Sequence, residues 1–309
     1  MGTPDFAVPA LDILVQHNYN VVGVITAPDK PAGRGQQLHQ SSVKKYAVEN
    51  GLRILQPEKL KNPDFIAELK SLDANLFIVV AFRMLPEIVW QMPEFGTFNL
   101  HASLLPQYRG AAPINWAVIN GEKETGVTTF FLQHEIDTGN IILQEKINIE
   151  DEDNAGTVHD KLMNVGSALV LKTVQAIEND NVIESPQSIV DNPQLKHAPK
   201  IFKDTCEIDW KKTAQEIHNL IRGLSPYPAA FTYLNGKTLK IFASQKSHWS
   251  IDNSQLSKSS TIDYKTDNKT YFSVKCSDGW LDILELQLEG KKRMKVDGFL
   301  RGYKFTENN

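Results

Sequence analysis

The sequence contains few of the residues that point to a secreted, membrane-spanning or zinc-stabilised protein. Its 309 residues include only two cysteines, Cys206 and Cys276, too few for a disulfide framework, so we expect a reducing, cytoplasmic location. No 18 apolar residues run together, so no membrane span is predicted. The first residues lack the basic and apolar regions of a secretory signal. No group of Cys and His has the spacing of metal ligands, so we expect no metal site.

Several catalytic and nucleotide-binding signatures are missing as well. No Gly-x-Gly-x-x-Gly follows the first apolar run, and Gly-x-x-x-x-Gly-Lys-Ser/Thr occurs nowhere, which disfavours NAD and ATP as ligands. The Gly33-Arg34-Gly35 element is too short to cradle a phosphate. The absence of Gly-x-Ser-x-Gly leaves serine hydrolase chemistry unsupported.

Charge is distributed unevenly along the chain. Lys and Arg total 33 and Asp and Glu total 37, a net charge of -4. From Ile201 onward there are 17 basic and 13 acidic residues, net +4, which leaves 16 and 24, net -8, in the first 200. This asymmetry permits a polyanionic partner for the C-terminal part, although an ordinary solvated surface gives the same counts.

Up to residue 180 the sequence alternates short apolar runs with amphipathic segments. Strand-like runs are expected at 20–25, 74–81, 96–100 and 127–132. Helices are expected at 10–16, 43–50, 63–72, 112–120 and 155–179. Nearly continuous apolar strands separated by helices are typical of an open, doubly wound, mostly parallel sheet, whose ligands lie beyond the carboxyl ends of its strands. The alternating run 141–149 predicts an added antiparallel strand.

A second, smaller domain is expected towards the C-terminus. Residues 181–200 are polar and contain Pro186, Pro193 and Pro199, so they are interpreted as a linker. A helix at 213–222 is followed by strand-like runs at 230–234, 239–243, 271–276 and 281–288. Short strands separated by turns predict a small, OB-like β-barrel. The expected division is therefore an α/β domain at 1–180, a linker at 181–200 and a β-barrel domain at 201–309.

The densest candidate for chemistry lies where the strand at 96–100 ends. Asn99 and His101 are two residues apart, so the period of a strand puts both side chains on one face and Leu100 on the other. A carboxamide donor beside an imidazole can stabilise an oxyanion and transfer a proton. Asp137 follows another expected strand and can face His101 if the two strands are neighbours. A structural role for Asn-x-His stays open, and the spacing names no substrate.

Longer strings of residues resemble the folate-dependent formyltransferases. The string HASLLPQYRGAAPINWAVINGEKETGVT at 101–128, followed by IDTG at 136–139, is similar to the signature of that family. Further similar strings lie at 2–11, 26–38, 79–82, 208–232 and 297–302, so the resemblance covers nearly the whole chain. It implies the Rossmann-like sheet of the formyltransferases for the first domain.

The resemblance also implies roles for individual residues. Asn99, His101 and Asp137 match the catalytic trio of the family. The folate-contacting segment matches Ser103, Leu104, Leu105 and Pro106, together with the backbone near Phe82. The loop at 26–44, with Arg34 as its key side chain, resembles an insertion that enters the acceptor stem of initiator tRNA. The barrel would hold the outer face of this tRNA, through candidate side chains Lys237, Lys291, Lys292 and Arg293. For these basic residues a solvated barrel edge is the alternative.

The function implied is formyl transfer from 10-formyltetrahydrofolate to the α-amine of methionine on initiator tRNA, for translation initiation. We expect a monomer without metal or redox cofactor. The alternatives are transfer to an amino sugar or another small amine, transfer to glycinamide ribonucleotide, and hydrolysis of the folate. A non-catalytic tRNA- or folate-binding protein is disfavoured because Asn99, His101 and Asp137 occur together.

Two departures from the family pattern stand out. The family usually has a short apolar strand before the Gly-Thr-Pro turn, whereas here Met1 directly precedes Gly2, so we expect that the start was assigned too late. Phe82, Arg83 and Met84 are bulkier than the small residues expected beside the pterin, a change that bears on folate affinity and not on chemistry.

Overall fold

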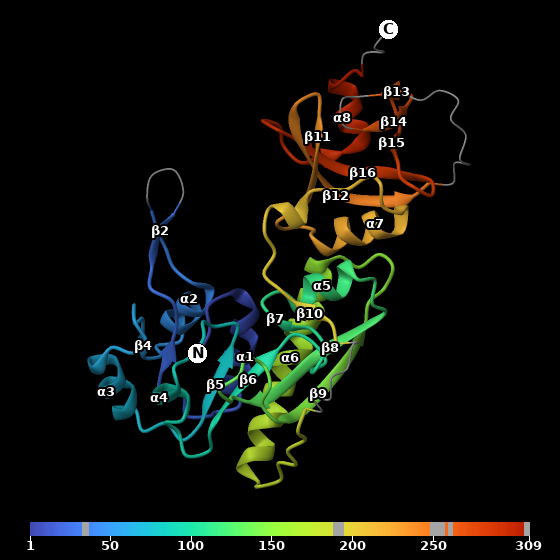
Figure 1. Ribbon diagram of the computed structural model, residues 1–309. Helices are drawn as coiled ribbons and strands as arrows, with labels where there is room; N and C mark the ends of the chain where they lie inside the picture. The colour runs from blue at the N-terminus through green and yellow to red at the C-terminus, as the bar shows by residue number, and fades with distance from the viewer. Residues whose placement is uncertain (33–36, 188–194, 248–256, 259–261, 306–309) are drawn as a thin grey trace. The chain divides into compact units, whose positions relative to one another are not determined.

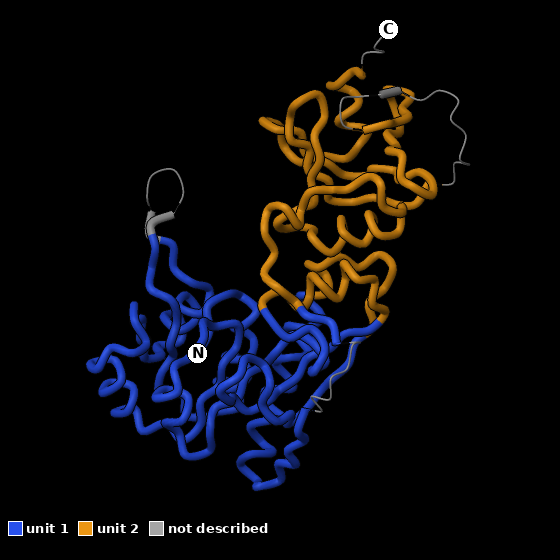
Figure 2. The backbone as a smooth tube through the Cα atoms, viewed as in Figure 1, with its two compact units in different colours: residues 1–110, 124–147, 159–197 blue, residues 111–123, 148–158, 198–309 orange. Residues whose placement is uncertain are grey.

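The computed structural model describes residues 1–32, 37–187, 195–247, 257–258 and 262–305. The chain forms two compact units (Figure 2). Unit 1 comprises residues 1–110, 124–147 and 159–197, and unit 2 comprises residues 111–123, 148–158 and 198–309. Two segments that precede residue 180 thus belong to unit 2. Among the described residues no helix is long and apolar enough to cross a membrane.

The elements up to residue 180 follow the expected alternation (Figure 1). In chain order they are η1 (Asp5–Ala7), α1 (Val8–Gln16), β1 (Val24–Ile25), β2 (Lys30–Ala32), β3 (Gln37–His39), α2 (Ser42–Glu49), β4 (Ile54–Leu55), α3 (Pro63–Ser71), β5 (Phe77–Val80), α4 (Glu87–Trp90), β6 (Thr97–His101), β7 (Arg109–Gly110), α5 (Pro113–Ile119), β8 (Glu124–Phe131), β9 (Ile141–Asn148) and α6 (Ala155–Glu178). Local chemistry sets several helix starts: Ser41 caps α2, Asn62 caps α3, and the Asn154 side chain accepts from the N–H of Gly156 at 2.8 Å at the start of α6.

The sheet of unit 1 is mixed. β5 lies parallel to β6, and β1 lies parallel to β4. The first two residues join these pairs, because Gly2 N donates to Ile25 O at 3.1 Å and Val80 N donates to Met1 O at 2.9 Å. The predicted doubly wound α/β fold is confirmed, but the strand expected at 127–132, now β8, runs antiparallel to β6.

The direction of β8 places the β8–β9 loop at the edge where β6 begins. Leu132 N donates to Thr97 O at 2.8 Å there. β9 is antiparallel to β8, as predicted, since Phe131 pairs with Asn140 while Gly126 lies against Glu145. A Cβ on Gly139 would lie 1.6 Å from the Phe131 carbonyl oxygen, so only glycine allows this close return of the loop.

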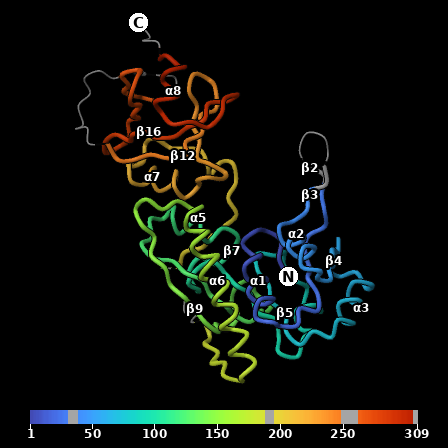
Figure 3. The backbone as a smooth tube through the Cα atoms, turned by 180° about the vertical axis from the view of Figure 1, so that it is seen from behind, coloured from blue at the N-terminus to red at the C-terminus, as the bar shows by residue number. Residues whose placement is uncertain are grey.

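Helix α6 decides which face of the sheet is open to a ligand (Figures 1 and 3). A Cβ on Gly166 of α6 would lie 2.9 Å from the Leu100 side chain and 3.5 Å from Val127, so α6 packs on the face that carries Leu100. Asn99 and His101 alternate with Leu100 along β6 and point to the opposite face, as the sequence predicted.

Most of unit 2 is built by the elements after residue 197, together with α5; β10 begins at the last residue of unit 1. From there on the elements are β10 (His197–Ala198), η2 (Asp204–Cys206), α7 (Ala214–Gly223), β11 (Ala230–Leu234), β12 (Lys237–Lys246), β13 (Ser257–Lys258), β14 (Asp263–Thr266), β15 (Phe272–Lys275), β16 (Trp280–Leu288), β17 (Met294–Lys295) and α8 (Val296–Gly302). A capping box of Thr213 and Glu216 begins α7. The antiparallel order is β11-β12-β16-β15-β14-β13, with β17 also paired to β16. Register shifts near Ala243 bend β12, and the sheet curls into a half-barrel around Leu239, Phe272 and Leu281.

Candidate active site

His101 is held between two oxygen atoms where β6 ends. Its Nε2 lies 2.9 Å from the carbonyl oxygen of Tyr108, and its Nδ1 lies 3.9 Å from Oδ2 of Asp137. The two side chains are only 9% and 14% exposed. Because a carbonyl only accepts, Nε2 carries a proton and donates to it. Nδ1 lies too far from Asp137, at 3.9 Å, for a hydrogen bond to that carboxylate, so it is free to contact a ligand.

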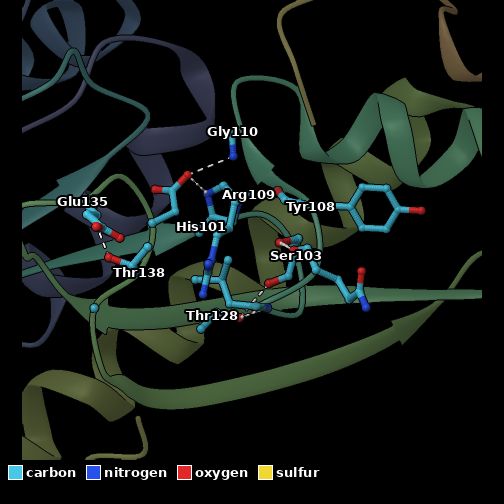
Figure 4. Close-up of polar contacts among 12 residues, drawn as sticks. His101, Ser103, Tyr108, Arg109, Gly110, Thr128, Glu135 and Thr138 are labelled. Carbon is cyan, nitrogen blue, oxygen red and sulfur yellow. Dashed lines mark hydrogen bonds and ion pairs between the residues drawn. The ribbon is translucent and has the colours of Figure 1, made fainter. Parts of the chain in front are cut away.

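Asp137 is positioned by its own backbone and by the segment after His101. Its φ of 56° lies in the left-handed region, which aspartate tolerates better than most residues. Its Oδ2 accepts from the N–H of Gly110 at 3.0 Å. Figure 4 shows His101 and Gly110 joined by dashed lines to this same carboxylate. The β8–β9 loop thus returns Asp137 to the open face of the sheet.

Asn99 lies on the same face as His101 and is available to a ligand. It pairs through its backbone register with Val79 on one side and Phe130 on the other, and it is partly exposed. Among the residues that the structure describes, its carboxamide has no hydrogen-bond partner. An amide donor beside an imidazolium on one sheet face can stabilise a developing oxyanion.

The segment from Ser103 to Pro106 is fixed by buried hydrogen bonds. Ser103 is buried, and its hydroxyl donates to Gln107 O at 2.6 Å. Leu105 is buried, whereas Leu104 and Pro106 are half-buried. Since their side chains are enclosed, Ser103 and Leu105 can reach a folate only through the backbone. The contact of these four residues with folate stays a prediction.

Phe82 follows β5, the strand beside β6. Val80 pairs with Leu100, so the loop after β5 and the segment after His101 start at one edge of the sheet. The Phe82 ring is half-buried against the core of unit 1. Arg83 stacks on this ring at 5.6 Å and donates to the carbonyls of Pro57 and Glu58. Phe82 and Arg83 therefore anchor the loop, whereas the Met84 side chain is exposed. Folate binding near Phe82 stays a prediction.

The predicted tRNA-binding residues are distributed as follows. Arg34 lies outside the described residues; the flanking strands β2 and β3 pair antiparallel. In unit 2, Lys237 opens β12, and Lys291 and Lys292 lie in the β16–β17 turn, all three exposed. The β11–β12 turn, which ends at Lys237, lies beside the β16–β17 turn, because Glu289 N donates to Thr238 O at 2.8 Å. The Arg293 side chain already has partners in unit 2, because it forms an ion pair with Glu285 at 2.5 Å and stacks over the Phe242 ring at 4.2 Å.

Sequence reasoning missed three polar residues that build this site. Thr128 and Gln144 hold the segment after His101, and Gln187 holds Arg109 and the loop of Asp137. Burial lowers the pKa of the Arg109 guanidinium, although the negative charges of Asp137 and, to a smaller extent, Glu135 act to raise it. Thr128 and Gln144 lie within strands and Gln187 within a polar stretch, so no local pattern distinguishes them.

Among the described residues no three His, Cys, Asp or Glu side chains gather as a metal site.

Comparison with known proteins matches the chain to one family. Residues 1–174 match the Formyl transferase family, and residues 200–304 match the Formyl transferase C-terminal domain. A methionyl-tRNA formyltransferase of Phocaeicola vulgatus is 60% identical over 317 residues, covering 100% of this chain and 96% of the relative. One of Bacteroides thetaiotaomicron is 56% identical over 315 residues, covering 99% and 95%.

Solved structures share the fold at lower identity. The sugar 3N-formyl transferase WlaRD, solved with dTDP and 5-N-formyl-THF, has a TM-score of 0.67 at 24% identity, covering 94% of this chain and 97% of its own. An N-formyltransferase of Helicobacter canadensis, solved with folinic acid and dTDP-3-aminofucose, has a TM-score of 0.65 at 23% identity, covering 95% and 97%. These likenesses show the fold alone. The extent and identity of the sequence matches show that the chain belongs to the formyl transferase family and, within it, to the methionyl-tRNA formyltransferases.

Proposed function

We propose that this protein transfers the formyl group of 10-formyltetrahydrofolate to the α-amine of methionine carried by initiator tRNA. The observation that carries the proposal is the His101–Asp137 pair beside the unpartnered carboxamide of Asn99, on the face of the sheet that α6 leaves uncovered. Relatives named for this reaction, 56% and 60% identical over nearly the whole chain, support the choice of acceptor.

The reaction exchanges one bond and one proton. The amine nitrogen bonds to the formyl carbon, the bond from that carbon to N10 of the folate breaks, and a proton passes from the amine to N10. The tetrahedral intermediate carries an oxyanion, to which the Asn99 NH2 and the Nδ1–H of His101 donate. Nδ1 takes this role because Tyr108 occupies Nε2. Asp137 balances the imidazolium charge and can accept the proton that leaves the amine.

The folate would lie where the loop after β5 meets the segment after His101. The register of β5 and β6 supports this placement, since Val80 and Leu100 are partners and the two loops leave from the same edge. Ser103 to Pro106 and the backbone near Phe82 would contact it. The internal hydrogen bonds of the 103–106 segment keep its shape fixed before the ligand arrives, which lowers the cost of ordering.

The tRNA would contact unit 2 through the exposed lysines at the β11–β12 and β16–β17 turns, and unit 1 through Arg34. Phosphate contacts release counterions, so affinity would fall steeply with salt. Lys291→Ala should weaken tRNA binding and reduce the slope of log affinity against log salt by about one. Arg293→Ala should affect the slope less, because Glu285 already pairs with this side chain. A salt-independent affinity would refute this part of the proposal.

The test is formyl transfer from 10-formyltetrahydrofolate to methionyl-initiator tRNA, compared with an amino sugar, glycinamide ribonucleotide and water as acceptors. The proposal predicts that the tRNA is strongly preferred, and a preference for an amino sugar would support the alternative. We further propose that residues 1–180 carry the chemistry and 201–309 bind tRNA, that residues 181–200 link them, and that the enzyme acts as a cytoplasmic monomer without metal. Sedimentation and metal analysis of the active protein test the last two points.

A further inference from the structure

Gln187 is a buried side chain that contacts the active site from a distant part of the chain. It is 6% exposed and lies in the segment interpreted from sequence as a linker. Its Nε2 donates to Asp137 O at 3.0 Å and to Gly139 O at 2.8 Å. Its Oε1 accepts from Nε and Nη2 of Arg109, the former at 3.1 Å. One amide therefore joins both sides of the site.

Chemistry fixes the orientation of this amide. The carbonyls of Asp137 and Gly139 can only accept, and the Arg109 guanidinium can only donate, so the NH2 must face the loop and the oxygen must face Arg109. All four hydrogen bonds that a carboxamide can form are thereby made. Because the group is buried, each of these bonds is costly to leave unmade.

The contacts of Gln187 converge on the position of the Asp137 carboxylate. On the loop side, Gln187 holds the carbonyl of Asp137 itself. On the other side, it holds Arg109, whose neighbour Gly110 donates its N–H to Oδ2 of Asp137. The backbone and the carboxylate of Asp137 are thus fixed from two directions, and His101 lies 3.9 Å from that carboxylate.

We propose that Gln187 is a positioning residue for catalysis, acting through Asp137. The inference rests on the proposed function, since the work of Asp137 is formyl transfer. Gln187 touches no reacting atom. Its amide keeps the carboxylate at the distance from His101 at which it balances the imidazolium and receives the amine proton. A displacement of about 1 Å at such a group costs on the order of 100-fold in rate.

The test uses two variants and a matched control in the full chain. Gln187→Glu keeps an oxygen for Arg109 but turns a second oxygen towards the carbonyls of Asp137 and Gly139. Gln187→Met removes all four hydrogen bonds without repulsion. Glu184→Ala removes a neighbouring link of the same segment, the acceptor of the Asn140 side chain at 2.7 Å, without touching Asp137. Both Gln187 variants should lower kcat about 10- to 100-fold, with the KM for each substrate within about twofold of wild type, and the control should retain wild-type kcat.

A double-variant cycle tests whether the effect passes through Asp137. In an Asp137→Asn background, Gln187→Glu should lower kcat further by less than about twofold, because the group it positions is already inactive. Undiminished kcat in both single variants, a rise in KM alone, or full additivity with Asp137→Asn would each overturn the inference.

A measurement independent of turnover separates this inference from the proposed function. Hydrogen exchange in Gln187→Met should increase for peptides covering 133–141 and stay unchanged for peptides covering 97–101, while Glu184→Ala should leave the N–H of Gly110 protected. If the wild type transfers no formyl group, the proposed function fails. Unaltered exchange of residues 133–141 and of the Gly110 N–H in Gln187→Met would overturn the positioning role, whatever the turnover of the wild type.

Discussion

Replacing Thr128 by valine should destabilise unit 1 far more than the loss of a buried hydroxyl ordinarily does. Thr128 is fully buried on β8, and its hydroxyl donates to Ser103 O at 2.6 Å. The same oxygen accepts from Leu105 N at 3.1 Å and from the Gln144 side chain at 2.9 Å. Valine has nearly the same shape but neither donor nor acceptor. The substitution therefore leaves the buried carbonyl of Ser103 and the N–H of Leu105 without partners.

The expected loss follows from these two backbone groups. An unsatisfied buried group costs about 1–3 kcal/mol, so two groups cost about 2–6 kcal/mol. Gln144 keeps its bond to Leu105 O at 2.9 Å and adds little to this loss. The free energy of unfolding of Thr128→Val, obtained from urea titrations followed by circular dichroism, should therefore fall by at least about 2 kcal/mol.

Thr125→Val is the matched control for this measurement. Thr125 is also buried on β8, but its hydroxyl makes no hydrogen bond within the described part of the chain. Its replacement should change the free energy of unfolding by less than about 0.5 kcal/mol. Equal stability of the two variants would refute the reasoning that Thr128 is the hydrogen-bonding centre that fixes the segment after His101.

Three further outcomes are expected. Gly139→Ala should lower the free energy of unfolding by at least about 2 kcal/mol and should also lower kcat, because the added Cβ meets the Phe131 carbonyl and displaces the loop of Asp137. Urea titration and steady-state rates measure the two effects. A wild-type rate would contradict this prediction. Asn99→Ala should lower kcat by about 100-fold through loss of an oxyanion donor, and near-wild-type turnover would remove Asn99 from the mechanism. Although burial acts to raise it, the pKa of Asp267 is held well below its usual range by hydrogen bonds from the Thr270 hydroxyl and from backbone N–H groups. The ionised Asp267 therefore adds to the stability of the fold above its pKa in the unfolded chain, near 4, and this contribution is lost as the pH falls towards its lower pKa in the folded protein. The urea midpoint of Asp267→Ala should be lower than that of the wild type at pH 7 and should approach the wild-type midpoint below pH 4. A difference that stays constant with pH would refute this.

Local chemistry made much of the fold predictable. Helix starts are set by residues within four positions, such as Thr213 and Glu216 at α7, so their expected positions hold to within a few residues. The placement of Asn99 and His101 on one face follows from strand geometry alone, and the packing of Leu100 against α6 agrees with it.

Long-range contacts decided what the sequence left open. The apolar pattern of β8 is the same for a parallel and an antiparallel strand, so only its pairing with β6 shows the direction. That direction puts Asp137 on a loop that must fold back, which requires the close approach at Gly139.

The sequence by itself determined the types of the longer elements and the family, and it singled out Asn99, His101 and Asp137 as the trio that we propose for catalysis. Each of these is written in neighbouring positions or in strings long enough to be specific. Only the tertiary structure decided how the trio is held. Gln187 lies 50 residues after Asp137 and 78 after Arg109, and no periodicity or motif links such positions. Burial and hydrogen-bond satisfaction bring them together, and these are properties of the folded chain as a whole.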